Sequence, residues 1–205
     1  MGTRNLTAVF YKGEYRIAQY GQWDGYPEGQ GMTALKFLRE RMNRPEFERA
    51  LLNIEQITDG EIKNAWIEAG ADPFSDFVTP DVSRKFREIH PELSRDTGAE
   101  ILEIVQNHPD GIKLNLDLAF AAESLFCEWA WVIDLDAGTF EGYEGFNESR
   151  ELTEEDRFYF LRDKESDGYH GVVLAGKWSL DALPTPEEFL DYFSVNEDED
   201  EEEDQ

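Results

Sequence analysis

Two strand–turn–strand segments, one near each end of the chain, constrain the fold more than any other feature. Residues 6–20 read LTAVFYKGEYRIAQY, two β-forming runs on either side of a short turn at residues 12–14. Residues 127–143 alternate apolar and polar side chains and then return after a tight turn at residues 137–138. Because an isolated two-stranded hairpin is only marginally stable in water, both hairpins are expected to join one sheet.

The long segment between the hairpins, residues 32–126, has a mostly helical pattern. Leu35, Leu38 and Met42 recur at helical spacing with charged residues between them. Residues 116–126 have two overlapping apolar faces, which predicts a buried helix. The predicted fold class is therefore α+β, a largely antiparallel sheet covered by helices, with a helical insert of about 90 residues.

One helix in this insert has clear start and stop signals. Residues 58–61 (TDGE) open a helix that carries Ile62, Trp66 and Ala69 and stops at Gly70. The pattern predicts a helix that begins after Thr58 and ends at Gly70.

The C-terminal part of the chain completes the predicted domain. Further strands are predicted at residues 157–161 and 171–175, and a last helix begins at Pro186 and ends close to the domain boundary. We predict one domain over residues 1–193 and a disordered acidic tail over residues 194–205.

Net charge limits the possible partners. The chain has 19 Lys and Arg against 46 Asp and Glu, a formal charge of −27, and residues 197–204 are all acidic. Contacts to nucleic-acid phosphates and to anionic lipids require clustered basic residues, so neither direct nucleic-acid binding nor membrane binding is expected. The charge has two remaining explanations, solubility through self-repulsion and docking to a basic partner or mimicry of nucleic acid.

Cysteine and histidine usage points to a reducing compartment and gives no metal site. Cys127 is the one cysteine, which excludes an internal disulfide and favours a cytoplasmic, soluble protein. Strand alternation predicts that Cys127 is a small buried side chain on the same face as Trp129 and Trp131. The three histidines are too scattered for a metal cluster, and no cofactor is predicted.

The loop after the first hairpin, QYGQWDGYPEGQG at residues 19–31, has an unusual composition for a connection. Its glutamine amides both donate and accept hydrogen bonds, its aromatic side chains offer flat faces for stacking, and its glycines allow close backbone approach. Few polar groups among aromatic side chains are typical of small-molecule pockets. The predicted ligand-binding residues are Arg4, Gln19, Gln22, Trp23, Asp24, Tyr26 and Gln30.

A structural explanation of the same loop stays open. Asp24-Gly25 and Tyr26-Pro27 are common turn pairs, and the aromatic side chains can cap the end of a sheet. The loop matches neither the dinucleotide-binding fingerprint nor the P-loop. Similarly, Asp134 is expected only to solvate the end of its strand.

Two blocks of sequence carry a resemblance to a known group of proteins. Residues 3–7 (TRNLT) with 18–27 (AQYGQWDGYP), and residues 127–136 (CEWAWVIDLD), resemble the signature of uncharacterised proteins of fungi, bacteria and phages. This resemblance implies a shared fold and no particular activity. The first hairpin also resembles the start of N-terminal-nucleophile hydrolases, whose chemistry would require the chain to begin at Thr3, whereas removal of Met1 exposes Gly2.

Three functions follow from the sequence. The first is binding of a small polar ligand or a peptide end at the loop, with Asp24 as a hydrogen-bond acceptor or general base and Arg4 as the partner of a ligand anion. The second is an acidic interaction module, and the third is an N-terminal-nucleophile hydrolase. Whether the protein is an enzyme stays open at this point.

Overall fold

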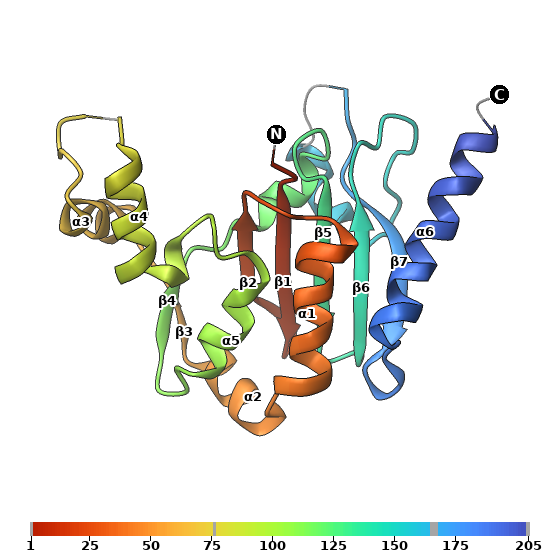
Figure 1. Cartoon of the computed structure of the whole chain (residues 1–205), viewed down its shortest axis with the longest axis horizontal. Coiled ribbons are helices and arrows are strands. Elements are labelled where there is room, and N and C mark those ends of the chain that lie inside the picture. The colour runs from red at the N-terminus through yellow and green to blue at the C-terminus, as the bar shows by residue number, and fades with distance from the viewer. Residues whose placement is uncertain (1, 76, 165–167, 204–205) are drawn as a thin grey trace.

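The computed structural model describes residues 2–75, 77–164 and 168–203 and contains one five-stranded sheet (Figure 1). The strand order is β2-β1-β5-β6-β7, and within this sheet β1 and β5 are parallel while the other neighbours are antiparallel. The largely antiparallel sheet predicted from the sequence is therefore confirmed. The strands are β1 (Asn5–Tyr11), β2 (Glu14–Gly21), β5 (Trp129–Asp134), β6 (Thr139–Glu144) and β7 (Val173–Ser179).

Both predicted hairpins are present. In the first turn, Lys12 and Gly13 have φ values of 52° and 77°, the left-handed pair that a two-residue hairpin turn requires. The Asp136 carboxylate accepts hydrogen bonds from both backbone N–H groups of this turn, at 2.9 and 2.8 Å. The two hairpins join through β1 and β5, where Asn5 lies opposite Trp129.

The segment between the hairpins is less helical than predicted. It contains α1 (Met32–Lys36), α2 (Arg44–Leu52), α3 (Asp59–Ala69), α4 (Pro80–Ile89) and α5 (Ile101–Gln106). It also contains two short strands, β3 (Ile54–Gln56) and β4 (Ile112–Leu114), which form a separate parallel pair. The predicted continuous block of helices is therefore wrong in extent.

The predicted start and stop of α3 are confirmed. Thr58 and Glu61 form a complete capping box, and Gly70 ends the helix with φ of 107°. The predicted buried helix at residues 116–126 is instead a half-buried segment with a short 3-10 helix, Leu118–Ala122. Its backbone forms hydrogen bonds with other segments of the chain, because Asp117 N donates to Ala18 O and Ala121 O accepts from Val172 N.

The C-terminal elements differ from the prediction in two places. Residues 157–161 form no strand, because successive 3-10 turns bend the chain there and lead into the 3-10 helix Tyr159–Lys164. The last helix, α6 (Pro186–Glu203), continues past residue 193, where the domain was expected to end.

The sheet separates two apolar cores. The helix face is covered by α1, α2, α5 and α6, and its core contains Leu35, Phe47, Trp131, Phe140 and Phe189. The opposite face, called here the cavity face, is covered mainly by the 3-10 segments, and its core contains Leu6, Ala130, Val132, Tyr143 and Phe158.

Cys127 belongs to the second of these cores. It is fully buried, as predicted, and burial raises the pKa of its thiol. It lies outside β5 and packs with Ala130 and Val132, so the expected shared face with Trp129 and Trp131 is wrong. The alternation breaks because β5 begins only at Trp129.

Candidate functional site

The loop at residues 19–31 uses many of its polar groups to hold itself in place. Asn5 Nδ2 donates to Trp23 O at 3.1 Å, and Gln19 Nε2 donates to Ser94 O at 3.0 Å. Gln30 donates to Trp23 O at 3.2 Å and accepts from Ala99 N at 2.7 Å. These bonds attach the loop to β1 and to the segment at residues 94–99.

The glycines of the loop permit close packing. A Cβ atom on Gly29 would lie 2.1 Å from Asp24 O, and one on Gly31 would lie 2.6 Å from the Trp131 ring. Trp131 Nε1 donates to Gly25 O at 2.9 Å, which ties the loop to the core of the helix face. The glycine-rich composition is thus explained by packing.

The side chains of the other predicted site residues contact different parts of the chain and do not converge on one site. Trp23 and Tyr26 are exposed, and Trp23 Nε1 donates to Asp96 Oδ1 at 2.8 Å. Gln22 accepts from the Tyr20 hydroxyl at 2.8 Å, and Arg4 lies 4.6 Å from the centre of the Phe126 ring.

Asp24, one of the predicted site residues, has a left-handed backbone conformation with φ of 56° at an exposed position. Asp and Asn tolerate this conformation better than most residues. The structure therefore brings Gln19, Trp23 and Gln30 onto the 94–99 segment and leaves Asp24 and Tyr26 at the surface.

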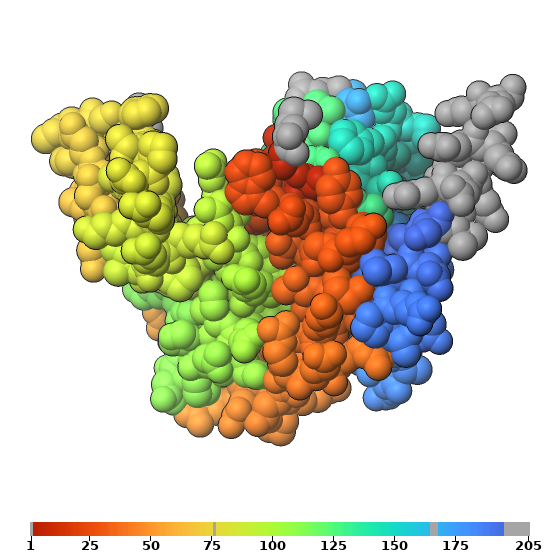
Figure 2. All heavy atoms as spheres, viewed as in Figure 1, coloured from red at the N-terminus to blue at the C-terminus, as the bar shows by residue number. Residues whose placement is uncertain are grey.

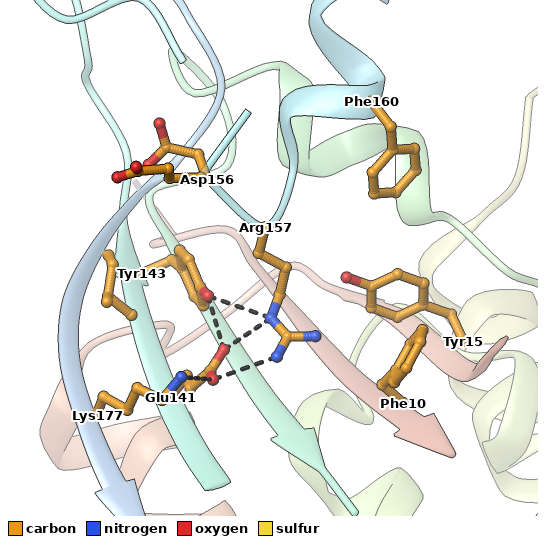
Figure 3. A pocket seen from close by; sticks show the side chains of 10 residues that line it. Phe10, Tyr15, Glu141, Tyr143, Asp156, Arg157, Phe160 and Lys177 are labelled. Atoms are coloured by element: carbon orange, nitrogen blue, oxygen red, sulfur yellow. Dashed lines mark hydrogen bonds and ion pairs between the residues drawn. The ribbon is translucent and has the colours of Figure 1, made fainter. Parts of the chain in front are cut away.

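A cavity of about 460 Å³ opens on the cavity face of the sheet (Figure 3). Strands from both hairpins, β7 and residues 155–160, which lead into the 3-10 helix Tyr159–Lys164, all contribute to its wall. Its lining residues are Phe10, Tyr15, Glu141, Tyr143, Glu155, Asp156, Arg157, Phe160, Leu174 and Lys177.

An ionic cluster forms the floor of this cavity. Arg157 donates to Asp134 Oδ2 at 2.6 Å and to Glu141 Oε2 at 2.7 Å, so one guanidinium bridges β5 and β6. Lys177 Nζ lies 2.9 Å from Glu141 Oε1, and the Tyr143 hydroxyl donates to Glu141 Oε2 at 2.7 Å. We call Asp134, Glu141, Tyr143, Arg157 and Lys177 the ionic cluster.

Glu141 is charged although its side chain is only 1% exposed. Burial alone would raise the pKa of this carboxyl, but hydrogen bonds from Arg157, Tyr143 and Lys177 outweigh burial and lower the pKa to about 2. Burial raises the pKa of Tyr143, and the Glu141 charge raises it further. Burial would lower the pKa of Arg157, but its carboxylate partners raise it.

This cluster was not found by sequence reasoning. Asp134 was interpreted as solvating a strand end, but it is buried, accepts from Asp136 N and Ala137 N, and pairs with Arg157. Two signals were available. Glu141 sits between apolar neighbours in a strand with both faces covered, and basic residues such as Arg157 are scarce in this chain.

The low pKa of Glu141 makes stability depend on acid pH. The carboxyl titrates near 4.5 when unfolded and at about 2 when folded, so its stabilising contribution is complete above pH 4.5 and is lost as the pH falls toward 2. We expect a loss of roughly 3 kcal/mol from this group across that interval. Urea unfolding at several pH values measures it.

Two variants attribute the acid dependence to Glu141. Glu141→Gln is expected to reduce the slope of the pH profile between 4.5 and 2, whereas Glu155→Gln, which alters an exposed carboxylate at the rim, should leave this slope unchanged. Equal slopes in wild type and Glu141→Gln would contradict this origin.

Aromatic side chains form the wall beside the ionic cluster. Tyr15 lies edge-on to Phe10 with ring centroids 5.0 Å apart, and its ring centroid is 6.2 Å from that of Phe160. The Phe160 ring is 53% exposed. In Figure 3 the Arg157 guanidinium points toward the Tyr15 hydroxyl. Burial raises the pKa of Tyr15, and the nearby Arg157 charge opposes this rise.

Two kinds of feature are absent from the described residues. No three His, Cys, Asp or Glu side chains within them are grouped so that they could hold a metal ion. Within the same residues, no helix combines the length and the apolar composition that crossing a membrane requires.

Comparison with known proteins finds no matching family model, no matching curated protein and no matching solved structure. The resemblance of the 3–27 and 127–136 blocks to uncharacterised fungal, bacterial and phage proteins therefore stays a prediction.

Proposed function

We propose that this protein binds a small, planar, polar ligand in the cavity of the cavity face. The observation that carries the proposal is an aromatic wall, in which Phe160 is exposed, next to a fixed ionic cluster around a volume of about 460 Å³. Apolar walls with a few fixed polar groups are the usual composition of ligand sites. A ring of the ligand would stack on Phe160 and Tyr15.

The polar groups that face the cavity favour a hydrogen-bond acceptor on the ligand. Glu141 Oε1 and Oε2 together accept from Thr139, Tyr143, Arg157 and Lys177, so this carboxylate is saturated. Lys177 is half-exposed, and in the described part of the chain Glu141 is the carboxylate paired with it. An ammonium has three N–H donors, so Lys177 retains donors for a ligand.

Charge limits the ligand further. Within the cluster Asp134 and Glu141 balance Arg157 and Lys177, while Asp156 at the rim is paired with Arg150. Glu155 adds a negative charge at the rim. A neutral or zwitterionic ligand with a carbonyl or amide acceptor fits this balance better than an anion, which the surrounding negative charge would repel.

The ionic cluster also argues for a function beyond stability. Buried ion pairs are frequently no more stabilising than apolar side chains of similar volume. A chain that retains one beside an open cavity holds polar groups in fixed positions, which lowers the cost of ordering them when a ligand binds.

The test uses four probes with the same ring and different charges: benzamide, benzylamine, benzoate and phenylalanine. Titration into isotopically labelled protein, followed by two-dimensional NMR, reports both affinity and position. We expect benzamide and phenylalanine to shift the signals of residues around the cavity, with benzoate and benzylamine weaker by threefold or more. Equal shifts from all four probes would contradict the electrostatic selection.

Two substitutions test how much the cavity residues contribute to ligand affinity. Phe160→Ala and Lys177→Met each should weaken benzamide binding by about five- to tenfold, since each removes one contact worth about 1 kcal/mol. Both residues are at least half exposed, so the fold should be retained. Phe74→Ala is the matched control, because Phe74 is an exposed phenylalanine remote from this cavity.

Residues 19–31, which the sequence predicts to bind a ligand, are an alternative location for the same function. The internal hydrogen bonds of Gln19 and Gln30 support a structural role for that loop, which is why the cavity is preferred. Trp23→Ala in the same titrations separates the two sites. If it abolishes the shifts and Phe160→Ala does not, the loop is the binding site.

A further inference from the structure

Helices α3 and α4 form an arm that stands beside the sheet. Trp66 of α3 and Phe86 of α4 stack with ring centroids 3.7 Å apart, and Ala65 and Ala69 complete a small apolar cluster. This cluster is separate from the two cores of the sheet. Figures 1 and 2 show the arm projecting at one side, with a hollow between it and the body.

The connection between α3 and α4 exposes large apolar side chains. Phe74 is 97% exposed and Phe77 is 74% exposed. Their backbone is fixed locally, because Phe74 N donates to Asp72 Oδ1 at 2.9 Å and Phe77 N donates to Ser75 Oγ at 3.1 Å. Neighbouring exposed aromatic side chains are a common mark of interaction sites.

A groove of about 380 Å³ runs between α3 and this connection. Its larger apolar lining residues are Ile62, Trp66, Ile67, Pro73 and Val78. We call these five residues, with Phe74 and Phe77, the arm surface. Its shape and composition suit an amphipathic helix that places apolar side chains in a groove.

The charge of the groove and of the whole chain indicates which kind of partner can bind the arm surface. Asp59 and Asp72 line the groove against one cation, Lys63, and the whole chain carries a charge of −27. A second copy of the chain would bring the same negative charge and be repelled, and an anionic lipid surface would be repelled as well. The cations of α4, residues 84, 85 and 87, do not line the groove.

We propose that the arm surface docks a basic amphipathic segment of another protein. Apolar side chains of the partner enter the groove between Ile67 and Val78 and contact Phe74 and Phe77. Lysine or arginine residues beside them face Asp59 and Asp72. This interaction is independent of the ligand cavity, which lies on the sheet.

The test measures binding of two synthetic helical peptides with the same leucine pattern, one carrying lysine and the other glutamate at its polar positions. Fluorescence anisotropy with the full chain is expected to detect the lysine peptide and not the glutamate peptide. Phe74→Ser/Phe77→Ser should weaken the lysine peptide by at least about tenfold, which corresponds to about 1.4 kcal/mol. Phe146→Ser, at an exposed position in the connection after β6 that does not line the groove, should change the affinity by less than twofold.

Several outcomes would overturn the proposal. Unchanged affinity in Phe74→Ser/Phe77→Ser would mean that the peptide binds the acidic surface in general. Binding of the glutamate peptide as tightly as the lysine peptide would remove the role of charge. Sedimentation velocity that finds a wild-type dimer and a monomeric double variant would assign the arm surface to self-association. Circular dichroism must show the same helix content in all variants.

Discussion

Replacing Arg157 with methionine is expected to lower the free energy of unfolding by about 3 to 5 kcal/mol at neutral pH. The variant keeps a long apolar stem but removes the cation that bonds Asp134 and Glu141. Both carboxylates are almost fully buried, so losing their shared partner leaves Asp134 with backbone donors alone and Glu141 with Lys177 as its remaining cation. For a chain of this size the unfolding midpoint should fall by roughly 6 to 20 °C.

A double variant distinguishes electrostatics from lost packing. Arg157→Met combined with Glu141→Gln removes one of the stranded charges, so it should be more stable than Arg157→Met alone. Chemical denaturation of wild type, both single variants and the double variant completes the cycle. If the double variant is as unstable as the sum of the single variants, the guanidinium acts mainly by packing.

Replacing Trp131 with alanine is expected to cost about 4 to 5 kcal/mol and also to loosen the loop at residues 19–31. Trp131 is fully buried and packs against Trp129, Phe140, Phe189 and Phe193. Its indole N–H also donates to Gly25 O, so its removal leaves both a cavity and an unpaired carbonyl.

Hydrogen exchange measures the effect of this substitution on the loop. The amides of Gly29 and Gln30 donate within the loop, at 3.0 and 2.8 Å, and should exchange faster in Trp131→Ala than global destabilisation explains. Trp178→Ala is the control, because Trp178 packs against the same core and, among the described residues, its side chain makes no hydrogen bond to the loop. Equal loop exchange in variants of equal stability would refute the anchoring role.

Local signals in the sequence predicted the local elements. The turn at residues 12–14 and the alternation around Trp129 and Trp131 depend on neighbours along the chain, and both hairpins are present. The start of α3 after Thr58 and its stop at Gly70 are local in the same sense. Each of these features combines turn or cap chemistry with a periodic pattern.

Features that depend on tertiary packing could not be predicted. Residues 116–126 have a helical apolar pattern, yet their backbone bonds to Ala18 and Val172 instead. The ionic cluster joins Glu141 in a strand to Arg157 in a connection, and their meeting depends on how that connection crosses the sheet. The loop at residues 19–31 was conspicuous by composition, but composition alone does not distinguish a packed anchor from a ligand site.

The parallel pairing of β1 with β5 has a consequence for synthesis of the chain. Asn5 pairs with Trp129, so one edge of β1 has no partner until the ribosome has made every residue between them. At cellular rates of synthesis this takes on the order of 10 s. During that time the nascent hairpin exposes an apolar strand edge, which is a site for aggregation. We therefore expect chaperone demand to be greatest before β5 emerges, and folding to be limited by closure of this long loop.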